Sequence, residues 1–510
     1  MSAYFKEHRQ LLPVAGLSLL HLIITFFTDK LVFLVLPSAG LADYVVCKLL
    51  TYAVLFFFYH GLYQIFIDKN RKENAIFQIV KCALPYLLVL AVILIIKLPS
   101  GYLSNDETLI YDAAVSLEHY TWFYYITTYY YIVSLMLIPH YLGPIFIKVL
   151  IQFLVVGYVV YRVKKVLGNK YGNWGYALFL LYPVIAYTTS AHRLPVYYLL
   201  YLVLITTLLF DLLEKKAPNK VRLFWLLFLG AILTQWRTEG IYLAVLVPLL
   251  LFLVYKNIRT KKTAFAVIAC SLLLQYIISI PQNGFAASNL NAAADDRMKP
   301  FYAYTITNMY RNGLDLEKNA ADLAIVDKYL SLEAIAAIND YYEDINYEDV
   351  LILYQEGYVG TRPEATLEDF SNYTAALKHI FINNPDVFLK TRWGAFCYAA
   401  LPFKITFEGF GLRQLISFGV SVVKTISYNL FIPLVIALLL CLYALIKRRW
   451  FTFFTTGGLL AHWFIVFILA PASYFKYYFP VYSIAYFYVL LIILQLIYNR
   501  HHEEKVEFLV

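Results

Sequence analysis

Long apolar runs recur along the chain, and most have about the length that a helix needs to cross a membrane. The hydrocarbon core of a bilayer takes roughly twenty apolar residues of helix. The pattern predicts an all-α polytopic membrane protein with about twelve transmembrane helices, within a range of roughly eleven to thirteen. The expected spans are 11–28, 44–67, 76–97, 142–162, 173–190, 195–213, 222–236, 239–255, 263–281, 425–446, 450–470 and 478–498.

Lysine and arginine gather on one side of this predicted membrane. Cytoplasmic loops of membrane proteins carry an excess of Lys and Arg. If the chain crosses twelve times and both termini are cytoplasmic, all the basic clusters lie on the cytoplasmic side. We expect a multi-pass protein of the plasma (cell) membrane with both termini in the cytoplasm. The clusters are the N-terminus, 69–72, 162–165, 214–222, 256–262, 447–449 and the residues around Arg500.

Two segments on the opposite, outer side are too long to be turns. The first, 98–141, contains the aromatic run HYTWFYYITTYYYIVSLMLIP. Counting this run as a span would reverse every later basic cluster, so we expect an interfacial helix or helix pair there. The second, 282–412, carries 18 Asp and Glu against 10 Lys and Arg. Its helical patterning predicts a small, mostly helical outer domain.

Composition supports the membrane assignment and excludes several other classes. Of the 510 residues, 61% are hydrophobic and 15% are charged, whereas a soluble domain has about a quarter charged residues. The net charge of +9 comes from the basic loops, so it does not indicate nucleic-acid binding. The five cysteines are scattered without a CxxC motif, which predicts neither a zinc site nor a disulfide framework.

Ionisable residues at the outer ends of spans are candidates for function, because charge near a membrane is costly. Asp106 and Glu107 follow the third span in GYLSNDETLIYD. Ser104 and Glu107 also have the spacing of a capping box, which is a purely structural role. The cap and a catalytic role for Asp106 are compatible.

Other candidates also have structural interpretations. His192 and Arg193 could contact lipid headgroups, Arg237 and Glu239 could form a polar turn, and Lys476 beside Tyr477 could anchor the chain at the interface. Together, however, a carboxylate and fixed cations on one side suit the transfer of a sugar from a phosphate-linked lipid to a hydroxyl. The carboxylate accepts the hydroxyl proton, and the cations stabilise the leaving phosphate.

Four motifs in order resemble the GT-C superfamily of membrane glycosyltransferases, in the branch of the protein O-mannosyltransferases and the lipid A aminoarabinose transferase. They are LSNDETLIYDAAVSL, YPVIAYTTSAHRLPVYYLL, TQWRTEGIYLAVLVPLL and SYFKYYFPVYSIAYFY. The resemblance covers roughly residues 76–280 and 425–498 and implies a GT-C-like fold. The sequence departs from the family in having two additional spans before residue 76, and Lys476 stands where an arginine is common in the family.

The resemblance implies roles for individual residues. Asp106 is the candidate base and Glu107 the second acid, whereas Arg237, Lys476 and Arg193 are candidates for the lipid phosphate. Glu239, His192 and Tyr477 are supporting residues. The donor would be a polyprenyl-phosphate sugar, and the acceptor a cell-envelope glycan, lipid or protein on the outer face. We expect no tightly bound cofactor and no metal-ligand set, and a requirement for a divalent cation stays open.

The predicted organisation has five parts. They are an additional two-span segment (1–75), a GT-C-like core with the acidic loop 98–141 (76–281), an extracytoplasmic domain (282–412), C-terminal transmembrane helices (413–498) and a cytoplasmic tail (499–510).

Two other functions are compatible with the sequence. A transporter or flippase for a lipid-linked saccharide also needs many spans and cations near a lipid phosphate, but it predicts internal pseudo-symmetry, which the sequence does not clearly show. A lipid-linked glycan polymerase or ligase would instead use arginines of the large outer segment. The candidates for that role are Arg297, Arg311, Arg362 and Arg392.

Overall fold

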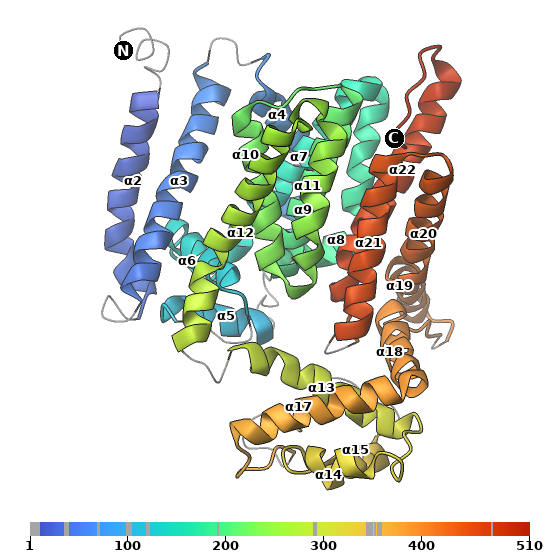
Figure 1. Cartoon of the computed structure of the whole chain (residues 1–510). Helices are drawn as coiled ribbons and strands as arrows, with labels where there is room; N and C mark the ends of the chain where they lie inside the picture. Colours follow the sequence, from blue (N-terminus) through green and yellow to red (C-terminus); the bar gives the residue numbers. More distant parts are fainter. Residues whose placement is uncertain are drawn as a thin grey trace. The chain divides into compact units, whose positions relative to one another are not determined.

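The computed structural model describes residues 11–34, 40–68, 72–97, 105–118, 123–190, 193–288, 293–342, 350, 353, 360–407, 409–470 and 473–510. The regular structure in these residues is helical (Figure 1). The chain forms two compact units. The first unit comprises Met1–Ile280, Leu439–Gly458 and Ser483–Val510, and the second comprises Pro281–Leu438 and Leu459–Tyr482.

Helices of membrane-spanning length confirm the prediction of a polytopic helical protein. Within the described residues, nine helical stretches are long and apolar enough to cross a bilayer. The prediction of twelve crossings stays a prediction. The nine are Leu11–Val32 (α2), Leu41–Phe66 (α3), Ala75–Lys97 (α4), Gly143–Leu180, Leu194–Leu213, Lys261–Gln282, Leu412–Ile446, Trp450–Leu469 (α21) and Phe475–His501.

Residues 173–190 do not form the single continuous helix that the apolar pattern predicts. Helix α7 (Gly143–Gly172) contains a non-helical residue, Gly168, with φ 76°. Three short helices follow: η2 (Asn173–Leu180), α8 (Tyr182–Ala186) and η3 (Tyr187–Thr189). Pro183 lies in the first turn of α8, where its missing N–H costs nothing, so the proline starts a new helix here.

The aromatic run of the first outer segment forms a short helix, α6 (Tyr125–Leu137), which packs against α5 (Asn105–Val115). At 1.5 Å per residue these helices are about 16 and 20 Å long, less than the ~30 Å of a hydrocarbon core. Neither helix is therefore long enough to be a span. Both lie near the lower end of the first unit in Figure 1, where α6 also contacts α7 and α10 (Lys220–Trp236).

The close packing of α4 against α7 depends on a glycine. A Cβ on Gly157 would lie 2.3 Å from the carbonyl oxygen of Ile79 and 2.8 Å from the Cβ of Ala83. Small residues allow helix backbones to approach in this way inside membranes, where lipid is as apolar as the side chains.

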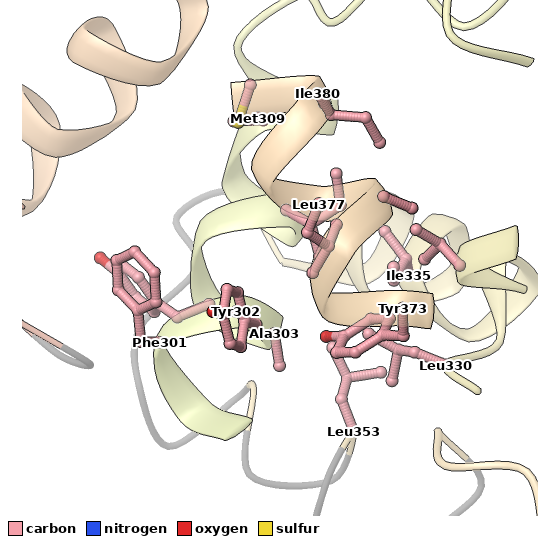
Figure 2. Packing of buried hydrophobic residues seen from close by; sticks show 14 of the residues in the cluster. Phe301, Tyr302, Ala303, Met309, Leu330, Ile335, Leu353, Tyr373, Leu377 and Ile380 are labelled. Atoms are coloured by element: carbon pink, nitrogen blue, oxygen red, sulfur yellow. The ribbon is translucent and has the colours of Figure 1, made fainter. Parts of the chain in front are cut away.

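Five helices of the second unit enclose a common hydrophobic core: α13 (Ala293–Arg311), α14 (Ala320–Val326), α15 (Leu332–Tyr341), α17 (Leu367–Asn383) and α18 (Pro385–Ala400). Figure 2 shows Tyr302 of α13 beside Tyr373 of α17, and their ring centroids are 6.1 Å apart. Thr366 and Asp369 form a capping box that fixes the start of α17. These contacts lie within the segment that the sequence assigns to an outer domain.

The predicted span 425–446 begins later in the structure. Helix α19 (Leu412–Ser427) overlaps its first three residues, and the apolar helix is α20 (Phe431–Ile446). Helix α19 is amphipathic and has no buried residue. Its exposed apolar side chains recur at helical spacing, as in Leu412, Ile416, Val420 and Val423, a pattern typical of a helix that lies along a membrane surface.

Candidate active site

Helix α5 places two carboxylates in its first turn. Asp106 and Glu107 lie at the N-terminal end of the helix, where the helix dipole favours negative charge. Glu107 is buried with 1% of its surface exposed, whereas Asp106 is partly exposed. Ser104, the other residue of the predicted capping box, lies outside the described residues.

A hydrogen bond joins Glu107 to the end of η3. Its Oε1 accepts from the Oγ of Ser190 at 2.8 Å. These two residues are 83 positions apart in the sequence. The contact therefore connects the acidic loop to the residues that precede helix α9 (Arg193–Leu213).

A buried lysine that the sequence analysis did not single out lies beside this contact. Lys148 of α7 is fully buried, and its Nζ donates to Gln152 at 2.9 Å and to the carbonyl oxygen of Thr188. Lys148 and Glu107 also interact electrostatically. The only sequence signal for Lys148 is a charged residue inside an apolar span, which is a general marker of function or of a specific pairing.

Tyr131 of α6 brings a second kind of group near the carboxylates. It is buried, and its hydroxyl has no hydrogen-bond partner among the described residues. Burial raises its pKa well above the ordinary value, and the negative charges of Glu107 and Asp106 raise it further. The phenol therefore stays protonated at neutral pH and can donate a hydrogen bond to a substrate oxygen.

Arg237 and Glu239 form an ion pair at a break between helices. Helix α10 ends at Trp236, Arg237 is extended, and η4 (Thr238–Tyr242) follows. The Nε of Arg237 donates to Oε1 of Glu239 at 2.6 Å, and Arg237 is 5% exposed. A Cβ on Gly240 would lie 2.4 Å from the carbonyl oxygen of Leu233, so this tight turn requires glycine.

Neighbouring tyrosines of α6 connect the acidic loop to this ion pair. The ring of Tyr130 packs edge-on against that of Trp236, with centroids 5.8 Å apart. Tyr131, the next residue, interacts with the charges of Asp106 and Glu107. The structure thus brings the two carboxylates and the Arg237 turn to the same helix, α6, within the first unit.

Lys476 lies in the second unit, in η7 (Phe475–Tyr478). Its Nζ is 4.9 Å from the ring centroid of Tyr474 and 5.9 Å from that of Tyr477. The carbonyl oxygen of Tyr477 accepts a hydrogen bond from Nε2 of His462 at 3.0 Å. These contacts fix Lys476 among aromatic rings, as the sequence pattern around it suggests.

Two further candidates from the sequence lie at or just before the start of α9. His192 and the side chain of Arg193 are not among the described residues. No group of His, Cys, Asp or Glu suited to hold a metal occurs in the part of the chain that the structure describes.

The arginines that favour a polymerase or ligase make structural contacts where they are described. Arg311 donates to the carbonyl oxygen of Tyr342 at 2.6 Å, and Arg362 pairs with Asp327 at 2.8 Å. Arg392 is 1% exposed and donates to the carbonyl oxygens at the end of α21, those of Phe467 and Ala470. The side chain of Arg297 lies outside the described residues.

Comparison of the chain with protein-family models, curated proteins and solved structures finds no match. The helices themselves identify a multi-pass membrane protein. Its function must be inferred from the chemistry of the clustered residues.

Proposed function

We propose that the protein is a GT-C-type membrane glycosyltransferase, which moves a sugar from a polyprenyl-phosphate donor to a glycan, lipid or protein acceptor on the outer face of the membrane. The observation that carries this proposal is the partly exposed carboxylate of Asp106, which interacts electrostatically with the buried phenol of Tyr131. Together they provide a proton acceptor and a hydrogen-bond donor at one point. A general base for the acceptor hydroxyl and a hydrogen-bond donor for a substrate oxygen both suit a sugar transfer.

In the proposed reaction, the acceptor oxygen attacks the anomeric carbon, and the bond from that carbon to the phosphate oxygen breaks. Asp106 takes the proton of the acceptor hydroxyl as general base. The polyprenyl phosphate leaves with the electron pair, and a single displacement of this kind inverts the anomeric configuration. Glu107 is a positioning residue, because it is buried and bonded to Ser190.

Cations stabilise the charge that develops on the leaving phosphate. Arg237 is our first candidate, because its guanidinium is buried and its turn adjoins α6 through Trp236. Lys476 and Arg193 are further candidates that the sequence motifs suggest, with Glu239, His192 and Tyr477 in support. We expect transfer to proceed without a tightly bound cofactor.

The test is sugar transfer by purified protein in detergent, with a panel of radiolabelled polyprenyl-phosphate sugars and cell-envelope acceptors. We expect Asp106→Asn to lower the rate by about 10²–10⁴-fold, because the amide cannot accept a proton. Donor binding and the melting temperature should be unchanged. Asp112→Asn is the matched control, since Asp112 is exposed on the same helix.

Transfer in detergent, where no transmembrane gradient exists, would exclude a pure transporter. A fully active Asp106→Asn protein would overturn the assignment of the base. Failure of wild-type protein to transfer any sugar of the panel, combined with uptake of lipid-linked saccharide by proteoliposomes, would favour the transporter instead.

A further inference from the structure

A second polar site lies in the first unit, far along α7 from Lys148. A cavity of about 390 Å³ opens among α4, α7, α9 and α10. Arg162, which lines it, follows Lys148 by fourteen residues, or about 21 Å along a helix. The cavity is therefore separate from the candidate active site. It lies at the end of the helices that carries the basic clusters, which the sequence predicts to be cytoplasmic.

The wall of this cavity is partly cationic and partly apolar. Four positive side chains line it, from α7, α10 and the segment between α9 and α10: Arg162, Lys165, Lys216 and Arg222. The apolar part is formed by Ala75, Ile79, Val203, Trp225, Leu226 and Leu229.

Two carboxylates neutralise only half of this positive charge. Asp211, fully buried, accepts from Arg162 at 3.1 Å and from Arg222 at 2.5 Å. Glu214 pairs with Lys165 at 3.0 Å and with Lys216 at 3.4 Å. Four cations and two carboxylates leave two positive charges around the cavity.

The carboxylate of Glu214 is charged at neutral pH. Burial raises its pKa, but the hydrogen bond from Lys165 and the charges of Arg162 and Lys216 outweigh that effect and lower the pKa below the ordinary value. Glu214 therefore counts as a negative charge, and the excess around the cavity is two positive charges.

Two arginines at this site have N–H donors left over. Arg162 is 4% exposed, and its Nη1 donates to the hydroxyl of Tyr158 at 3.0 Å. The Nε of Arg162 and the Nε of Arg222 are both buried without a hydrogen-bond partner among the described residues. A buried donor without a partner is unfavourable, and a bound anion would remove that penalty.

We propose that this cavity binds the phosphate headgroup of an anionic membrane lipid, with the lipid chains against its apolar wall. A phosphate monoester carries about −1.5 to −2 charges at neutral pH, which matches the two excess positive charges. Arginine suits phosphate because its guanidinium stays charged and carries several N–H donors, and here the Nε of Arg162 and of Arg222 has no partner among the described residues. The apolar wall, on helices of spanning length, favours a lipid over a soluble phosphate.

Lipid binding to the full-length protein in dodecyl maltoside, measured by native mass spectrometry, tests the proposal. The probes are dioleoyl phosphatidic acid, dioleoylglycerol with the same chains but no phosphate, and inorganic phosphate as a competitor. We expect phosphatidic acid to bind at least about tenfold more tightly than dioleoylglycerol. Millimolar inorganic phosphate should displace little of it.

Paired variants locate the binding. Lys165→Gln with Lys216→Gln removes two partly exposed cations of the cavity and should weaken phosphatidic acid binding by about tenfold or more. Lys261→Gln with Lys262→Gln removes two exposed lysines of the same predicted side outside the cavity and should leave binding unchanged.

Three results would overturn the proposal: equal binding of dioleoylglycerol and phosphatidic acid, equal loss in both variant pairs, or displacement of the lipid by inorganic phosphate at matched concentration. The last result would assign the cavity to a soluble phosphate. The melting temperature of each variant shows whether a loss of binding reflects misfolding.

Discussion

At the scale of single residues, the first unit contains charges where burial is costly. Lys148 and Glu107 are almost completely buried, and each has hydrogen-bond partners on another segment. An ionised group in a low-dielectric interior persists only when opposite charge and hydrogen bonds compensate the lost hydration. The two residues therefore stabilise the position of α5 relative to α7, and with it the position of Asp106.

Removing one of these charges should destabilise the protein more than removing both. We expect Glu107→Gln to lower the free energy of unfolding by about 2 kcal/mol, because Lys148 then remains buried without a carboxylate to interact with. Lys148→Met combined with Glu107→Gln should recover part of this loss. Thermal unfolding in detergent of both single variants and the double variant measures the coupling. Strictly additive effects would show that the two charges do not interact.

The sequence could predict some of these residue contacts but not others. Asp106 and Glu107 share the first turn of a helix, and Arg237 and Glu239 are two residues apart, so local patterning is sufficient to pair them. Glu107 and Ser190 come together only through the packing of distant segments. No local signal carries that information. A charge inside an apolar span marks Lys148, but the sequence does not show that it lies near Thr188 and Glu107.

At the scale of elements, apolar length predicted where helices lie better than where they break. The segment 173–190 is largely apolar, but Pro183 begins a new short helix within it, and Gly168 interrupts helix α7 before it. The expected span 425–446 begins inside α19, whose spacing of apolar residues indicates an amphipathic helix rather than the start of a span. In the first case glycine and proline determine the structure, and in the second the helical spacing of apolar residues does; total hydropathy determines neither.

The contact between α4 and α7 provides a test at this scale. Gly157→Ala should lower the free energy of unfolding by about 1–3 kcal/mol, because the new methyl group would overlap the backbone of α4 at Ile79. Gly61→Ala is the control, since no atom lies within 4 Å of a Cβ there and alanine favours the helix. Thermal unfolding of both variants measures the difference. Equal melting temperatures would show that α4 moves away without cost.

At the scale of the whole molecule, three shorter segments decide how often the chain crosses the membrane. A 3₁₀-helix rises about 2.0 Å per residue and an α-helix about 1.5 Å. If their short helices run roughly end to end, residues 173–189 and 238–254 reach about 30 and 28 Å, and α10 reaches about 26 Å. These lengths approach the ~30 Å of the hydrocarbon core. If α7 alone is the crossing within Gly143–Leu180 and residues 173–189 are a separate one, these segments give the chain its twelve predicted crossings, the number that gathers all basic clusters on one side.

Single cysteines in a variant without its five native cysteines test this topology in intact cells, with a membrane-impermeant maleimide. Exposed positions 118, 238, 318 and 368 should react from outside, whereas 170, 216, 262 and 447 should react only after permeabilisation. Position 238 reports on α10 and η4, because it is external only if α10 crosses. Positions 170 and 216 together report on 173–190: α9 alone separates them if that segment stays on one side. Labelling of 216 from outside, with 170 protected, would therefore remove one crossing. The later basic loops would then lie outside the cell, against the excess of Lys and Arg expected in cytoplasmic loops. Arg162 and Lys216, which line the same cavity, would then be assigned to opposite sides of the membrane.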